Sequence, residues 1–114
     1  MVRRKKGKPV NGWLVLDKSA GITSTRSVSN VRKILKAQKA GHAGTLDPIA
    51  TGILPIALGE ATKTVSYLVD REKSYVFTAK FGEARDTDDS EGEVVEKSTN
   101  RPDNRLIKLQ LNEF

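Results

Sequence analysis

Cysteine is absent from this chain of 114 residues, and histidine and tryptophan occur once each. Without cysteine there is no disulfide framework and no thiolate metal site, which is usual for a cytoplasmic protein. A single histidine has no second histidine or cysteine with which to share a metal ion, so we expect no metal centre. The longest apolar run, residues 53–58, is far too short to span a bilayer, so we expect no membrane partner.

Positive charge is concentrated in the first nine residues, which contain no acidic residue. The basic run is followed by Gly7-Lys8-Pro9, where a signal peptide would have an apolar segment. We therefore expect residues 1–10 to be a flexible basic arm that favours a polyanion such as RNA. A solvated tail that binds nothing specific explains the charge equally well. The basic residues of the arm are Arg3, Arg4, Lys5, Lys6 and Lys8, and the rest of the chain carries only +1 of the net charge of +6.

Hydrophobic patterning predicts an α+β protein. Residues 13–16 and 53–58 are continuous apolar runs, typical of short buried strands. Ser24 is placed to cap a helix over 25–38, and a second helix is expected near 60–70. The side chains expected to face inward are Val28, Val31, Ile34 and Leu35 on the first helix, and Ala61, Val65, Leu68 and Val69 on the second. The apolar face of the first helix does not include the basic residues Arg32, Lys33, Lys36 and Lys39. These either complement the helix dipole or contact RNA.

The later part of the chain alternates apolar and polar residues over 75–81, which predicts a strand. Residues 86–92 form an acidic turn, and residues 92–96 open a further strand. A calcium-binding EF-hand loop is excluded there, because Glu91 and Lys97 stand where glycine and glutamate are required. We expect a charged hairpin turn instead, followed by a last element over 106–111.

The most informative segment is residues 41–52, which read Gly-His-Ala-Gly-Thr-Leu-Asp-Pro-Ile-Ala-Thr-Gly. Glycine permits close approaches that a Cβ would block, and the proline biases Asp47 away from the helical region. Such a loop can hold one acid rigidly while a bulky ligand approaches the backbone. Taken alone, an Asp-Pro pair among glycines is more often a capped turn beside an ordinary loop histidine.

The longer pattern decides between these two interpretations. Residues 41–55, with Leu-Gly-Glu-Ala-Thr-Lys at 58–63, closely resemble the catalytic motif of the TruB-type branch of the pseudouridine synthases, the bacterial tRNA pseudouridine-55 synthases. Residues 12–18 and 21–24 resemble the opening strand and turn of that family, and Lys73-Ser74-Tyr75 is similar to its Lys-x-Tyr motif. The departures are Ser19, where the family usually has proline, and Thr25-Arg26, which replaces a commoner His-Asp pair.

The resemblance implies a fold and its extent in this chain. The fold would be a mixed, mainly antiparallel sheet with packed helices, here incomplete. Residues 11–114 would form the N-terminal part of the catalytic domain. The C-terminal part of that domain, which contributes an arginine near the catalytic aspartate, and a small RNA-binding domain are expected to be absent. Arg101 and Arg105 lack the local context of that arginine.

The resemblance also implies an activity and a site. The activity is isomerisation of a specific uridine of tRNA, U55 in the TΨC loop, to pseudouridine, which requires the nucleotide to be flipped out of its stack. Asp47 would be the catalytic aspartate, acting either by attack on the sugar or by promoting elimination. Tyr75 would stack on the target uracil and assist proton transfer, and His42 would contact the RNA near the flipped nucleotide. Lys18 and Lys63 match family positions with structural or phosphate-contacting roles, and no cofactor is required.

Two other functions remain as alternatives. The chain could be a truncated, catalytically inactive fragment that still binds structured RNA. It could also be a small basic RNA-binding protein unrelated to modification, although simple binding does not call for the carboxylate of the Gly-Thr-Leu-Asp-Pro loop. The expected partner is the TΨC stem-loop of tRNA, without a guide RNA or an obligate protein partner, because residues 21–24 look more like the stand-alone bacterial enzymes. With few aromatic residues, the chain should read RNA mainly through shape and backbone contacts.

Overall fold

The computed structural model describes residues 6–114 and divides the chain into two compact units, the first ending at Lys73 and the second covering Ser74–Phe114. Each unit has an antiparallel sheet and at least one helix, so the predicted α+β class is confirmed. The boundary after Lys73 divides residues 11–114, which the sequence pattern presents as one part of a catalytic domain.

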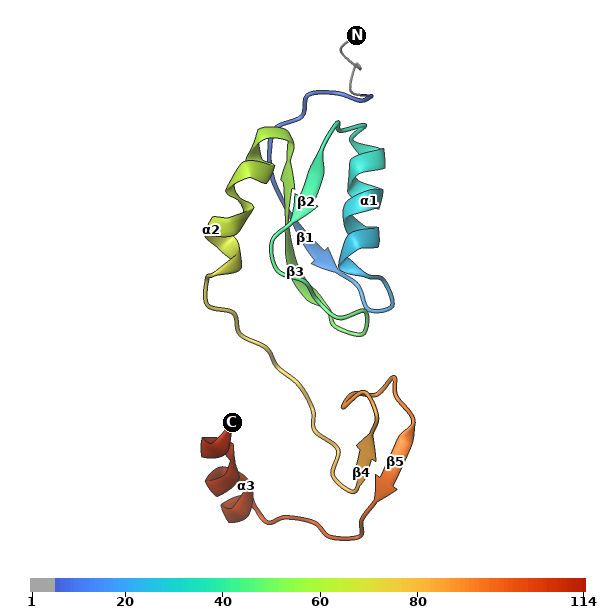
Figure 1. Ribbon diagram of the computed structural model, residues 1–114, viewed down its shortest axis with the longest axis vertical. Coiled ribbons are helices and arrows are strands. Elements are labelled where there is room, and N and C mark those ends of the chain that lie inside the picture. Colours follow the sequence, from blue (N-terminus) through green and yellow to red (C-terminus); the bar gives the residue numbers. More distant parts are fainter. Residues whose placement is uncertain (1–5) are drawn as a thin grey trace. The chain divides into compact units, whose positions relative to one another are not determined.

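The sheet of the first unit has three strands, in the order β1 (Gly12–Lys18), β3 (Gly52–Leu58), β2 (Ala40–His42) (Figure 1). Both outer strands run antiparallel to β3. The strand predicted over residues 53–58 is therefore confirmed. The strand predicted over 13–16 also exists, but its burial alternates and Val15 is 67% exposed. The expectation of a fully buried strand is wrong there, because Leu14 and Leu16 pack against the hydrophobic cluster while Trp13 and Val15, which alternate with them, are exposed.

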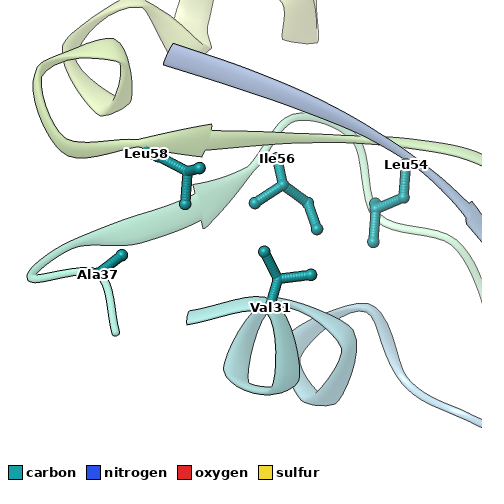
Figure 2. Close-up of a cluster of buried hydrophobic side chains, with 5 residues drawn as sticks. All are labelled: Val31, Ala37, Leu54, Ile56 and Leu58. Atoms are coloured by element: carbon teal, nitrogen blue, oxygen red, sulfur yellow. The ribbon is translucent and has the colours of Figure 1, made fainter. Parts of the chain in front are cut away.

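Helix α1 (Ser24–Ile34) packs across that face. Val31 points from α1 toward Leu54 and Ile56 on β3 (Figure 2), and Ala37 and Leu58 complete the buried cluster. All five side chains are at most 9% exposed. Burial of each larger aliphatic side chain contributes about 1.5–3 kcal/mol, so this cluster is the main source of stability in the first unit.

The start and the end of α1 differ from the sequence-based expectation. The N-cap is Thr23 and not Ser24, because the Thr23 hydroxyl accepts the N–H of Arg26 at 3.1 Å. The helix ends at Ile34 and not near residue 38. Ile34 was expected to face inward but is 78% exposed, since the buried stripe runs through Val31 and leaves Ile34 on its outer flank.

Pro55 lies in the central strand, where a missing N–H normally breaks the hydrogen-bond ladder. Its carbonyl accepts the N–H of Ala43 at 3.0 Å, on the side of β2. In an antiparallel pair the N–H and C=O of one residue point to the same neighbour, so the missing donor also falls on that side. Pro55 therefore leaves the hydrogen bonds between β1 and β3 intact. It lies next to the point where β2 ends, at His42, and the chain continues into the loop that follows.

After β3 the chain forms a 3₁₀ helix (Gly59–Thr64) and then α2 (Val65–Val69). The helix expected near residues 60–70 is thus present, but its first half has the tighter 3₁₀ geometry. Val69 was expected to face inward and is 45% exposed, since α2 ends at this residue.

The second unit contains a hairpin of β4 (Glu83–Arg85) and β5 (Val94–Lys97), joined by the predicted acidic turn. A carboxylate oxygen of Asp89 accepts hydrogen bonds from the Thr87 hydroxyl at 2.6 Å and the Glu91 N–H at 2.8 Å. These two bonds lower the pKa of Asp89 below its usual range. The acidic side chains therefore serve the turn itself, which agrees with the charged hairpin turn predicted from sequence.

The strand predicted over residues 75–81 is wrong. Residues 74–80 form neither helix nor strand, and among residues 6–114 no segment pairs with them. A strand needs a neighbour to satisfy its N–H and C=O groups, and alternating side chains alone do not supply one. Val76 and Phe77 are more than 80% exposed as a result.

The last element, predicted over 106–111, is helix α3 (Asn104–Gln110), followed by a 3₁₀ turn (Leu111–Glu113). Asp103 caps α3, because its carboxylate accepts the N–H of Leu106 at 2.8 Å. No apolar side chain of the second unit is buried, so the hydrophobic core belongs to the first unit alone. None of the helices formed by residues 6–114 has the length and apolar character needed to cross a membrane.

Residues 1–5 of the expected arm lie outside the described residues. The remainder of the arm is tied to the segment after α1. Lys8 forms a parallel bridge with Ala37, in which the Lys8 N–H donates to the Lys36 carbonyl at 2.6 Å and the Lys8 carbonyl accepts from the Gln38 N–H at 3.0 Å. The anchored part of the chain therefore begins before residue 10.

Candidate active site

The chain between β2 and β3 forms a loop, residues 43–51, called the acid loop here because it carries Asp47 (Figure 1). Gly44 has a φ of +80°, a conformation that side chains rarely adopt, and it opens the turn out of the sheet. The carbonyl of Asp47 accepts the N–H of Ala50 at 3.0 Å, which closes a turn around Pro48. The side chain of Asp47 is exposed.

Ser24, at the start of α1, fixes the residue before Asp47. Its hydroxyl donates to the carbonyl of Leu46 at 3.0 Å and accepts the N–H of the same residue at 2.9 Å. Ser24 is 2% exposed, so both bonds are shielded from water. Because Thr23 caps the helix, the Ser24 hydroxyl is available for the loop, a role that the cap assignment from sequence did not reveal.

Lys18, at the end of β1, fixes the residue after Asp47. Its ammonium group donates to the carbonyls of Ser19 at 2.8 Å, Ile22 at 2.8 Å and Pro48 at 3.3 Å. The Pro48 carbonyl also accepts the N–H of Gly21 at 2.7 Å. Lys18 is 1% exposed, and three carbonyl acceptors match the three N–H donors of an ammonium group. Of the two roles open from sequence, structural or phosphate-contacting, this geometry supports the structural one.

These contacts give Asp47 a defined setting. Leu46 is held by Ser24, Pro48 is held by Lys18 and Gly21, and the exposed carboxylate lies between the two fixed neighbours. Precise placement of one acid with access for a ligand is the arrangement that catalysis by proximity requires. The sequence motif predicted which acid lies in the loop. The side chains that fix its two neighbours, Ser24 and Lys18, come from a segment more than twenty residues earlier.

His42 is the last residue of β2 and lies opposite Ile56 of β3. The ring is half-buried, and its Nδ1 atom is buried without a hydrogen-bond partner among the described residues. A buried polar atom without a partner is costly. The structure thus places His42 at the strand end that leads into the acid loop, with its Nδ1 atom buried and unpartnered within residues 6–114.

Tyr75 belongs to the second unit, in the extended segment after the unit boundary, and is 61% exposed. Of the three predicted site residues, the structure therefore brings Asp47 and His42 into one unit and places Tyr75 in the other. The role of Tyr75 rests on the family motif.

Lys73, the first residue of the Lys-x-Tyr motif, adds a cation beside the acid loop. The Cε and Nζ atoms of Lys73 lie 3.2 Å from the position that a Cβ on Gly44 would occupy. Its ammonium group donates to the carbonyl of Val69 at 3.2 Å, which ties it to the end of α2. The sequence motif placed Lys73 near Tyr75, and its proximity to residue 44 appears only in the fold.

Lys63 differs from Lys18 in every respect. It is exposed and pairs with Glu60, three residues earlier in the 3₁₀ helix. Exposed pairs of this kind contribute about 0–1 kcal/mol. Within the described part of the chain the partner of Lys63 is thus Glu60, and its ammonium group does not hold the acid loop as that of Lys18 does.

Replacing Lys18 with methionine is expected to destabilise the fold by about 2–4 kcal/mol, because the carbonyls of Ser19, Ile22 and Pro48 lose the donor that the buried ammonium group supplies. Urea denaturation of the full-length protein measures the change. The matched control is Lys63→Met, which removes an exposed lysine and should stay within about 0.5 kcal/mol of wild type. Equal effects of the two substitutions would show that the bonds of Lys18 do not stabilise the loop.

Comparison with known proteins shows the family to which the chain is related. Residues 32–114 match the family described as TruB family pseudouridylate synthase (N terminal domain). The tRNA pseudouridine synthase B of Ruegeria pomeroyi is 59% identical over the whole chain, and that of Gluconacetobacter diazotrophicus is 56% identical over 99% of it. The chain spans only 38% and 37% of the length of these two relatives.

One solved structure shares part of the fold. It is described as an H/ACA RNP bound to a substrate RNA containing 2′-deoxyuridine, and the matched chain is 40% identical with a TM-score of 0.50. The match covers 60% of this chain and 25% of that chain. With the family match over most of the sequence and the motif-bearing acid loop in place, the chain belongs to the TruB family of pseudouridylate synthases, of whose N-terminal domain it carries the sequence.

Proposed function

We propose that a full-length protein carrying this segment isomerises a specific uridine of tRNA, U55 in the TΨC loop, to pseudouridine. The observation that carries the proposal is the exposed Asp47, held between two anchored neighbours in a loop that matches the catalytic motif of the family. The relatives named tRNA pseudouridine synthase B support the same substrate. Because the chain spans about 37% of such a relative, the proposal concerns the complete enzyme.

The reaction changes connectivity without changing composition. The C1′–N1 glycosidic bond breaks, the uracil turns, and a C1′–C5 bond forms, while the proton on C5 is lost and N1 gains one. The target nucleotide must first leave its stack, at a cost of a few kcal/mol. Asp47 is the carboxylate that acts at the sugar, either as a nucleophile at C1′ or by promoting elimination. The exposed acid loop leaves room for an RNA backbone to approach it.

The direct test uses two tRNA transcripts that differ only at position 55, with uridine in one and cytidine in the other. The full-length enzyme should form one pseudouridine in the first transcript and none in the second, as read by nucleoside mass spectrometry. Pseudouridine at any other position of the second transcript would contradict the assigned site.

We assign binding roles to two further side chains. His42 contacts the RNA beside the flipped nucleotide, a role supported by the family motif and by its position next to the acid loop. Tyr75 stacks on the target uracil and assists proton transfer, a role supported by the family motif and by the exposure of its ring. The guide-free mode of action follows the relatives named for tRNA and the resemblance of residues 21–24 to stand-alone enzymes. A cytoplasmic location follows from a tRNA substrate.

The two functions of Tyr75 can be separated by substitution. Tyr75→Phe keeps the ring and loses the hydroxyl, so turnover should fall while tRNA affinity stays near wild type. Tyr75→Ala also loses the stacking, worth roughly 1–3 kcal/mol per base, so affinity should fall as well. Single-turnover rates and filter binding measure the two effects. Wild-type rates and affinities for both variants would show that Tyr75 has only a structural role.

A further inference from the structure

Five exposed lysines gather at the C-terminal end of α1, and we call them the basic cluster. Lys6 and Lys8 come from the arm, Lys33 from the last turn of the helix, and Lys36 and Lys39 from the segment that leads into β2. In Figure 1 the arm passes beside this end of α1, while the acid loop lies at the other end of the helix.

The fold holds the two parts of the basic cluster together. The Lys8 N–H donates to the Lys36 carbonyl, and the Gln38 side chain donates to the Gly7 carbonyl at 3.0 Å. Gly7 itself has a φ of +110°, and a Cβ there would lie 2.7 Å from the Lys36 carbonyl oxygen. Only glycine allows this close approach, so the backbone of the arm is fixed against the end of α1.

Lys36 occupies a backbone position that suits glycine. The N–H of Ala37 donates to the Arg32 carbonyl at 3.0 Å and the N–H of Lys36 donates to the Lys33 carbonyl at 3.1 Å, which is the hydrogen-bond pattern of a Schellman helix end. Lys36 has a φ of +51°, the left-handed conformation in which glycine is favoured at this position. A lysine here costs stability, and residues with backbone strain of this kind concentrate at functional sites.

Charge in this part of the chain is one-sided. Asp17 is the only acidic residue among the first 46, so no carboxylate follows it before Asp47. Among the ion pairs found in residues 6–114, none involves a member of the basic cluster. The residues after the arm have a net charge of only +1, because the acidic residues from Asp47 onward balance the basic residues that precede them. The net charge therefore does not reveal that the basic residues come first.

We propose that the basic cluster binds the phosphate backbone of the substrate RNA at a distance from the reacting nucleotide. A helix of 11 residues is about 16 Å long, so a structured RNA with one nucleotide at Asp47 must extend along α1 to reach the cluster. Clustered lysines with exposed ammonium groups suit the phosphate backbone, which they bind without reading sequence. The inference deepens the proposed function and rests on it for the identity of the RNA.

The test uses Lys36→Gly in the full-length enzyme. Glycine relieves the left-handed strain, so the midpoint of thermal unfolding should rise. It also removes one phosphate contact, so tRNA affinity should fall and the slope of log affinity against log salt should decrease by about one. Lys36→Arg keeps the charge and should restore the wild-type slope. A variant that is more stable yet binds RNA more weakly cannot owe its defect to misfolding.

The matched control is Lys108→Gln, which removes a lysine from α3 and should leave the salt slope unchanged. A wild-type slope for both Lys36→Gly and Lys8→Gln would overturn the inference, whatever their activity. The proposed function fails separately, if the wild-type enzyme binds tRNA with the expected slope but forms no pseudouridine. A reduced slope in Lys108→Gln equal to that of Lys36→Gly would also overturn the inference, because the effect would then reflect net charge alone.

Discussion

An Asp47→Asn variant of the full-length enzyme is expected to lose pseudouridine formation by on the order of 10⁴-fold, the scale of loss seen when a catalytic side chain is removed from other enzymes. Asparagine has nearly the same shape, and the bonds that fix the loop join Ser24 and Lys18 to the backbone of Leu46 and Pro48. The loop should therefore keep its conformation while the negative charge is lost. Single-turnover assays on a tRNA transcript measure the rate.

The control for Asp47→Asn is Asp70→Asn, which removes an exposed carboxylate just after α2 in the same unit. It should have wild-type activity. Retained tRNA binding by Asp47→Asn, with an unchanged unfolding midpoint, would assign the loss to chemistry. Multiple turnover by Asp47→Asn would end the assignment of Asp47 as the catalytic aspartate.

A polypeptide of residues 1–114 alone is expected to be catalytically inactive, to self-associate and to bind a hydrophobic dye. The apolar side chains of residues 75–77 are unpaired and exposed, and the face of the sheet away from α1 exposes Val15 and Ile53 to more than 60%. Exposed apolar surface and unpaired backbone of this kind promote association. Size-exclusion chromatography and dye fluorescence measure the effect.

The two units should also differ in stability. The buried cluster lies wholly in the first unit, so its amides should resist hydrogen exchange, while those of Ser74–Phe114 exchange quickly. Replacing Phe77 with lysine should reduce dye binding, whereas Lys80→Gln, which removes an exposed charge from the same segment, should not. A monomeric, sharply melting 114-residue protein that forms pseudouridine would contradict this expectation.

The sequence predicted most of the elements that short-range patterns specify. The strand at 53–58, the helix over α1, the acidic hairpin turn and the final helix all follow from local periodicity and turn residues. Residues 75–81 show the limit of this reasoning. Their alternation has the period of a strand, but a strand forms only where another segment offers hydrogen bonds, and that depends on the rest of the fold.

The same limit applies to the site. The motif identified Asp47 because glycine and proline punctuate the loop around it. The roles of Ser24 and Lys18 depend on which distant backbone groups come within hydrogen-bond reach, and no spacing in the sequence encodes that. The basic cluster was missed in part for a similar reason, since Lys8 and Lys36 become neighbours only through the bridge between the arm and Ala37.

The anchoring of the acid loop also sets the order in which the site is built during protein synthesis. The side chains that hydrogen-bond to Leu46 and Pro48 lie within residues 18–24, and the central strand is complete at Leu58. Parts of a chain that have their own core fold as units, starting from the N-terminus as it emerges from the ribosome. By this rule the acid loop takes up its conformation on the nascent chain before residues 74–114 have left the ribosome.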